Sequence, residues 1–417
     1  MSAPPPRKRP ARSPLRGVPA SKASPPSRIP PRARAIAGWA VVAAALILAF
    51  APLSAAWVER VYANGLHPAI QRALTRATNL VPFTLGDLVF AAAILALPIV
   101  WVASLRAAGR LGLGRAVGLL LFRTAVLAAG AYLVFLLCWG LNYRRLPLAA
   151  KLDDDPARVT PAAARALAAR TIRLLDADGA LAHQSPWPDD AELVHLLAPS
   201  FDAAARRAGD TRNIVPAIPK TSLGDAFLGA SGTAGFTHPV THEVVLDRTV
   251  LDCEKPFLLA HEWGHLAGFA DESEASFVGL LACARSSSPG IRYAGWIALY
   301  EQLPAAALAA GPVAPGAEPI PALSPLVKAD LRAIAERTAR RRSPWISRLS
   351  SRTYDRFLKA NRVTEGIASY GLVVRLVLGV RFEEPWVPAP RVAGSKEGAG
   401  KAVKAGPAPA KPTASIR

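Results

Sequence analysis

Three long stretches without a charged residue constrain the fold of this chain more than any other feature. They are residues 35–58, 88–105 and 124–143. Each is long enough, as a helix, to cross the roughly 30 Å hydrocarbon core of a bilayer. One such stretch can be a buried helix of a soluble protein, but three in close succession favour the bilayer. We therefore predict an α-helical membrane anchor of three transmembrane helices over residues 35–143.

The composition agrees with a membrane protein and argues against nucleic acid as a partner. Hydrophobic residues make up 51% of the chain and charged residues only 19%. The net charge of +20 is concentrated at the two ends, since residues 1–34 contain nine lysines and arginines and residues 386–417 contain six. Both ends have little to bury, so we expect a disordered basic leader and a disordered tail. No groove-reading motif accompanies them, and we expect no nucleic acid.

The distribution of basic residues predicts the orientation in the membrane. The leader and the second connection, residues 106–123, are basic and contain no acidic residue, whereas the first connection, residues 59–87, is mixed. Short basic flanks stay in the cytoplasm. We therefore expect a multi-pass protein of the cell (inner) membrane, with residues 144–385 as an extracytoplasmic domain. The first stretch exceeds the length of a cleaved signal core, so we favour an uncleaved anchor.

The residues after the third stretch predict an α+β, mostly helical domain. Capping and turn signals indicate helices at residues 160–177 and 189–208, a helix opening at Ser324-Pro325, and a helix from Trp345 to about Arg381. Residues 214–218 and 241–246 have strand composition. Within the first connection, residues 61–74 are expected to form a short helix at the membrane surface or under the domain.

The motif that carries chemistry is His261-Glu262-Trp263-Gly264-His265, an HExxH sequence. Pro256 marks a helix start and Gly268 a helix end, so the two histidines lie one turn apart on the same face. Two such imidazoles can share a zinc ion, and Glu262 is placed to take a proton from the metal-bound water. We therefore predict His261 and His265 as metal ligands, Zn²⁺ as the cofactor and Glu262 as the catalytic residue.

A third protein ligand must come from the acidic residues that follow. Asp271 stands at the third-ligand place of the HExxHxxGxxH pattern, Glu272 opens a Glu-x-x-Ala sequence, and Glu274 lies two residues further on. Glu272 and Glu274 are about 200° apart around a helix, so both cannot face one metal ion. We favour Glu272 and keep Asp271 and Glu274 as alternatives.

The motif and its surroundings resemble an uncharacterised bacterial membrane family, domain-of-unknown-function family 3810. Residues 261–277 match its HExxHxxGFxxExEAxF signature, and further matches lie in Pro82–Asp87, Trp139–Arg144, Tyr354–Asn361 and Ser369–Gly371. The resemblance covers most of the chain. It implies a zincin-like HExxH domain on a three-span anchor, with no assigned substrate.

The Glu272-x-x-Ala275 sequence is also similar to gluzincin-type membrane metalloproteases that process CAAX proteins. In those proteases the first Glu is a ligand and an Asp four residues later supports a histidine, a position that Ser276 occupies here. If the domain is a zincin, residues 241–246 would form the edge strand beside the motif, where a peptide can add. Tyr370 and Arg375 are candidates to stabilise an oxyanion, and Cys253 and Cys283 are either buried thiols or a disulfide.

These observations predict a membrane-anchored zinc-dependent metallopeptidase that hydrolyses peptide bonds outside the cytoplasm. Its expected partners are the lipid bilayer and a peptide or protein substrate. The alternative is a non-catalytic membrane protein with a structural zinc ion or a peptide-binding zincin-like domain, which a closed coordination shell would indicate.

Overall fold

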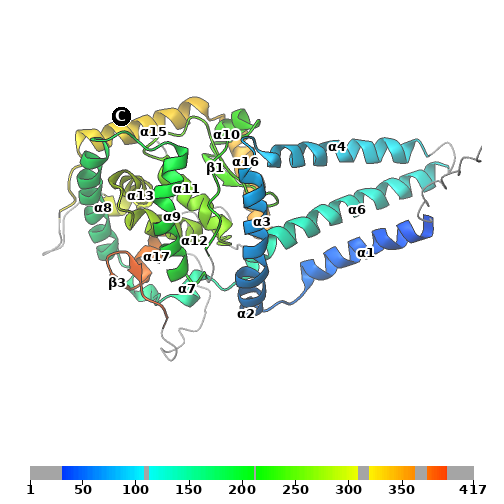
Figure 1. The fold of residues 1–417 in the computed structure, drawn as a ribbon, viewed down its shortest axis with the longest axis horizontal. Coiled ribbons are helices and arrows are strands. Elements are labelled where there is room, and N and C mark those ends of the chain that lie inside the picture. The colour runs from blue at the N-terminus through cyan, green and yellow to red at the C-terminus, as the bar shows by residue number, and fades with distance from the viewer. Residues whose placement is uncertain (1–30, 108–111, 211–212, 309–318, 362–372, 392–417) are drawn as a thin grey trace, which may run out of the picture.

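The computed structural model describes residues 31–107, 112–210, 213–308, 319–361 and 373–391. It is mostly helical, and three long apolar helices extend from one side of a compact helical body (Figure 1). These helices are α1 (Pro31–Phe50), α4 (Leu85–Leu105) and α6 (Leu113–Cys138), and α6 packs against both of the others. Each is long and apolar enough to cross a membrane. Three candidate spans are therefore present, as predicted.

The bounds of all three spans differ from the predicted ones: the second begins three residues earlier, at Leu85, and the third ends at Cys138 instead of residue 143. The first helix stops at Phe50 instead of residue 58, because Pro52 follows and cannot donate a backbone hydrogen bond to a continuing helix. The third begins earlier, at Leu113, and includes Arg123, whose guanidinium donates to Ser104 of α4 at 3.3 Å. The prediction started this helix after Arg123 because that residue is charged. The hydrogen bond to Ser104 gives the guanidinium a partner, so the helix can include it.

The connection between the first two spans is folded. It contains α2 (Ala55–Trp57), the π-helix η1 (Val58–Leu66) and α3 (His67–Asn79), which lie across the domain ends of the spans (Figure 1). The helix predicted at residues 61–74 is therefore present, but it is divided between η1 and α3, and α3 continues to Asn79. This connection and the body lie at the same end of the three spans.

The body is built around two antiparallel helices, α11 (Lys255–Leu266) and α12 (Glu272–Ala284), which are buried along almost their whole length. Trp263 and Phe277 of these helices are fully buried in the common core. The surrounding helices are α7 (Leu148–Lys151), η3 (Pro156–Arg158), α8 (Pro161–Ala182), α9 (Asp190–Arg207), α10 (Asp225–Ser231), α13 (Pro289–Gln302), α14 (Ala305–Leu308), α15 (Pro325–Arg341), α16 (Pro344–Ala360) and α17 (Val373–Gly379).

The strands are short and form two antiparallel pairs. One pair is β1 (Gly235–Thr237) with β2 (Val244–Leu246), and the other is β3 (Phe382–Glu384) with β4 (Val387–Pro388). The predicted strand at residues 241–246 is thus reduced to its last three residues. The helix predicted from Trp345 to Arg381 is α16 followed by α17, with residues 362–372 outside the described part.

The strand predicted at residues 214–218 is wrong. This segment is assigned to no strand, and side chains of α3 bind its backbone instead. Gln71 donates to the carbonyl of Val215 at 2.8 Å and accepts from its N–H at 3.1 Å, and Asn79 binds the carbonyl of Pro216 and the N–H of Ile218. Amide side chains provide both a donor and an acceptor, and so satisfy the backbone without a sheet.

Polar contacts fix the domain on the spans. The buried carboxylate of Glu243 accepts from the backbone N–H groups of Leu85 and Gly86, at the start of α4, at 2.9 and 2.7 Å. Lys220 forms a buried ion pair with the same carboxylate at 2.8 Å. Near the end of α1, Arg144 donates to the carbonyls of Leu48 and Ala49. The domain therefore holds the ends of separate spans with directed bonds.

Candidate metal centre

The two helices of the HExxH region approach each other backbone to backbone. A Cβ atom at Gly264 would lie 3.0 Å from Cα of Ala275, and one at Gly279 would lie 3.0 Å from the backbone nitrogen of His261. Between the helices, Gly268 has a φ of 86°, in the left-handed region where glycine is favoured. The glycines therefore let α12 return directly over the motif helix.

This turn brings Glu272 to the two histidines. One carboxylate oxygen, Oε2 of Glu272, lies 3.2 Å from Nε2 of His261 and 3.3 Å from Nε2 of His265. All three side chains are buried, and their ligand atoms lie within 4.8 Å of one another. In a tetrahedral zinc site with metal–ligand bonds of about 2.0 Å, ligand atoms lie about 3.3 Å apart. The two nitrogen–oxygen distances therefore fit one shared zinc ion.

The second nitrogen of each histidine has a partner. Nδ1 of His265 lies 2.8 Å from the carbonyl oxygen of Phe269, and Nδ1 of His261 lies 3.1 Å from Oγ of Ser276. Such contacts orient the ring and leave Nε2 to face the metal position. Oε2 of Glu272 is buried and has no hydrogen-bond donor among the described residues. A buried carboxylate oxygen in this state can act as a ligand for a cation.

The charges of the cluster favour a bound cation. Burial alone would lower the pKa of His265, but the neighbouring negative charge of Glu272 raises that pKa to about 9. Burial would raise the pKa of Glu272, yet the two histidines hold it well below its usual range. The Glu272 carboxylate is therefore ionised and attracts positive charge to the space between the two histidines. Protons on the histidines or a divalent metal ion can supply that charge.

The other two acidic candidates have different partners. Asp271 is the N-cap of α12, where its carboxylate accepts from the N–H groups of Ser273 and Glu274. Glu274 accepts from the N–H of Leu148 at 2.5 Å, and burial raises its pKa to about 7. Of the three carboxylates that the sequence left open, the structure places Glu272 with the histidines.

Glu262 is buried on the motif helix next to strand β1. Its Oε2 accepts from Oγ1 of Thr237 at 2.9 Å. Burial raises the pKa of Glu262; the neighbouring histidines oppose that change and the charge of Glu272 adds to it. A carboxylate with a raised pKa is a stronger proton acceptor, as a general base requires.

The sequence suggested residues 241–246 as the strand next to the motif. In the structure that strand is β1. Strand β2 lies between β1 and Lys220, whose backbone bonds Val244 and Leu246. Just outside the paired residues, Ala234 accepts from Asp247 and His238 donates to Glu243. Bonded pairs alternate in an antiparallel ladder, so Phe236 continues this series and the backbone groups of Gly235 and Thr237 face the other side.

The sequence analysis missed Thr237, which binds Glu262, and two further residues of the site. The hydroxyl of Tyr354 on α16 donates to Oε1 of Glu272 in a short hydrogen bond. Trp139, immediately after the third span, donates from its indole nitrogen to the carbonyl of His265 at 3.2 Å. Both stand in the segments quoted for the family resemblance, but no spacing rule links them to the motif, because they lie far from it in the sequence.

Of the two predicted oxyanion residues, the structure describes Arg375 alone. Arg375 on α17 pairs with Asp154 at 3.1 Å, and Tyr370 lies outside the described residues. Cys253 and Cys283 are free, buried thiols and not a disulfide. His242 is fully buried with its ring 5.4 Å from that of His67.

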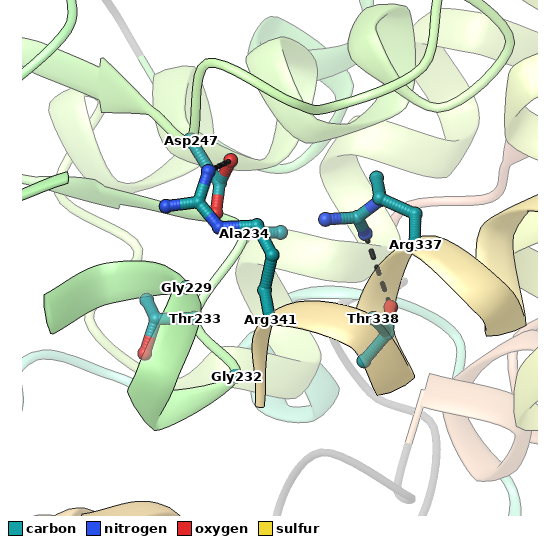
Figure 2. A pocket seen from close by; sticks show the side chains of 8 residues that line it. All are labelled: Gly229, Gly232, Thr233, Ala234, Asp247, Arg337, Thr338 and Arg341. Atoms are coloured by element: carbon teal, nitrogen blue, oxygen red, sulfur yellow. Dashed lines mark hydrogen bonds and ion pairs between the residues drawn. The ribbon is translucent and has the colours of Figure 1, made fainter. Parts of the chain in front are cut away.

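A small pocket lies beside the start of β1, and none of the candidate metal ligands lines it (Figure 2). Arg337 and Arg341 reach it from α15. Arg341 pairs with Asp247 at 2.8 Å, and Arg337 binds Thr338 at 3.3 Å and Glu254 at 2.8 Å. The remaining lining residues are Gly229, Gly232, Thr233 and Ala234. Both arginines have acidic partners, so these contacts support the segment that leads into β1.

The fold and site define a membrane protein whose three candidate spans carry a helical body with a buried His-His-Glu cluster. The sequence profile of the family described as protein of unknown function (DUF3810) matches residues 62–378, and the chain belongs to this family. The matched range includes every residue of the candidate metal centre. No curated protein and no solved structure matches the chain.

Proposed function

We propose that this protein is a membrane-anchored zinc-dependent metallopeptidase. The observation that carries the proposal is the geometry of His261, His265 and Glu272, with Glu262 on the same helix. Two imidazoles and one carboxylate form the ligand set of many catalytic zinc sites, which leave a fourth position for water or substrate. When bound, zinc polarises a substrate carbonyl and lowers the pKa of a coordinated water to about 7.

The residues of this chain have distinct roles in the proposed reaction. Glu262 accepts a proton from the attacking water and later delivers it to the leaving amine. Thr237 holds the Glu262 carboxylate through its hydroxyl. The outward backbone groups of Gly235 and Thr237 are suited to bind an extended peptide as an additional strand, which would carry a peptide bond past Glu262.

The proposed location follows from the basic residues of the flanks. The domain is extracytoplasmic and the spans lie in the cell (inner) membrane, so the substrate is a peptide or protein outside the cytoplasm. The first connection and the body lie at the same end of the spans, in keeping with that topology.

The central test is Glu262→Gln in the full-length protein. The amide leaves the histidines in place but cannot accept the proton, so this variant should keep stoichiometric zinc and lose proteolysis. Glu336→Gln, on the exposed side of α15, is the matched control. Comparing the extracytoplasmic proteomes of the wild type and the two variant strains identifies proteins that accumulate uncut with Glu262→Gln alone.

A Glu262→Gln strain with unchanged proteolysis would exclude the peptidase mechanism. Retained zinc in such a strain would favour the second candidate, a structural zinc ion in a non-catalytic domain. The burial of all three ligands is the observation on which that candidate rests.

A further inference from the structure

The helix that carries Tyr354 has a domain side and an exposed side. On α16, Ser347 and Leu358 are buried, and Tyr354 lies between them on the same face. On the opposite side, Trp345 is 63% and Leu349 is 58% exposed. A large, exposed apolar surface on an amphipathic helix marks a binding surface.

The apolar flank of α16 meets the third span. The ring of Phe357 lies 5.9 Å from that of Phe135, in the last turn of α6, and 6.1 Å from that of Tyr143 just after it. Helical spacing places Leu349 on the same flank as Phe357. In Figure 1, α16 is drawn at the boundary between the three spans and the body. The exposed flank therefore lies at the depth where α6 leaves the apolar layer.

Neighbouring elements extend this apolar surface. Helix α10 packs against α16, and the N–H of Ser343 donates to the carbonyl of Ala230 at 2.9 Å. Leu223, just before α10, is 88% exposed and Phe227 within it is 60% exposed. The N–H of Leu223 donates to the carboxylate of Asp87, in the first turn of α4, at 2.7 Å. The surface thus reaches from the end of the third span to the start of the second.

Basic side chains lie on the same exposed side of α16, beside the apolar ones. Arg348, Arg352 and Arg356 follow one another at intervals of four residues, with Arg356 next to Leu349, while Lys359 pairs with Asp355 at 2.8 Å. Long basic side chains beside an apolar flank can reach lipid phosphates while their stems cover apolar surface. This combination of flanks is typical of helices that lie in the membrane interface.

We propose that α16 and α10 form a membrane-contact surface, made up of Leu223, Phe227, Trp345, Leu349 and Phe357, that rests among the lipid headgroups on the domain side of the bilayer. Its partner is the lipid surface itself, continuous with the three spans. Because Tyr354 binds Glu272 from the opposite face of α16, this contact fixes the metal centre beside the headgroups. The inference does not require that the protein be a peptidase.

The test measures contact with lipid in the full-length protein in nanodiscs. An environment-sensitive fluorophore is attached at Leu349→Cys or, on the exposed side of α15, at Ala329→Cys, both in a Cys138→Ala background; Cys253 and Cys283 are buried. Lipids with a spin label high on the acyl chain should quench the fluorophore at position 349 at least threefold more than at position 329.

A second labelled variant, Phe227→Cys on α10, shows whether the result at position 349 is a local effect. Its fluorophore should be quenched as strongly as the one at position 349. Each labelled protein must elute from size exclusion as the unlabelled protein does. Equal quenching at positions 227, 329 and 349 overturns the proposal, and would leave the surface to a partner protein.

Discussion

Oγ of Ser276 lies 3.1 Å from Nδ1 of His261, so a hydroxyl on α12 orients the ring whose other nitrogen faces Glu272. In the membrane proteases that this motif resembles, an Asp at the same spacing supports a histidine. Serine can hold the ring in the same direction, but it adds no negative charge. In the proposed zinc site Ser276 is a positioning residue, and its contribution to metal affinity can be measured.

Ser276→Ala should weaken zinc binding about 10-fold to 100-fold, because partners of metal-binding histidines contribute on that order. Competition with a chelating dye, using the full-length protein in detergent, measures the affinity. Ser286→Ala removes another buried hydroxyl and should leave zinc binding unchanged. Equal affinities of the wild type and Ser276→Ala would show that the hydroxyl does not support the ligand.

His261→Ala and His265→Ala should each abolish stoichiometric zinc, because each removes one of three buried ligands. Elemental analysis of the purified full-length protein gives the metal content per chain. His183→Ala is the control, since this partly exposed histidine pairs with Asp330 outside the metal centre. A variant at either ligand position that retains one zinc ion per chain would contradict the proposed site.

Glu272→Ala should lose much of the zinc, whereas Asp271→Ala should keep it. Asp271 caps α12, so its loss should lower the free energy of unfolding by about 1 kcal/mol instead. Thermal unfolding and metal content, measured on both variants, separate the two effects. Zinc that is lost with Asp271→Ala and kept with Glu272→Ala would move the third ligand to Asp271.

Glu59 should make stability depend on pH in the acid range. Burial would raise its pKa, but the hydrogen bonds and charges of Arg145 and Lys151 lower it from 4.5 to about 2. A carboxyl group with a lowered pKa stabilises the fold above pH 4.5, and this contribution is lost as the pH falls toward 2. The melting temperature of Glu59→Gln should therefore fall less than that of the wild type between pH 5 and about pH 3.

Reporter fusions test the proposed orientation. An enzyme that is active only outside the cytoplasm should be active when fused after residue 150, and an enzyme active only inside should be active when fused after residue 110. The lysines and arginines of the leader and the second connection are the reason for this expectation. The reverse pattern would place the metal centre in the cytoplasm.

The sequence predicted what depends on local pattern. Uncharged length identified the three spans, and the spacing of His261 and His265 placed both on one face of α11. It could not predict that Gln71 and Asn79 would bind residues 214–218 in place of a strand, because that contact joins distant segments. The contact of Tyr354 with Glu272 has the same origin, since a pairing that depends on tertiary packing leaves no periodicity in the sequence.

The bonds of Glu243 to the start of α4 have a consequence for how the chain is assembled during synthesis. The spans leave the ribosome before Glu243 and Lys220, which lie later in the chain. Leu85 and Gly86 are therefore in place before the carboxylate that binds them is synthesised. A shortened protein that began after the third span would bury this ion pair without the helix end that completes it. Folding of the domain therefore depends on the start of α4, and we expect the His-His-Glu cluster to form only in a chain whose second candidate span is already helical.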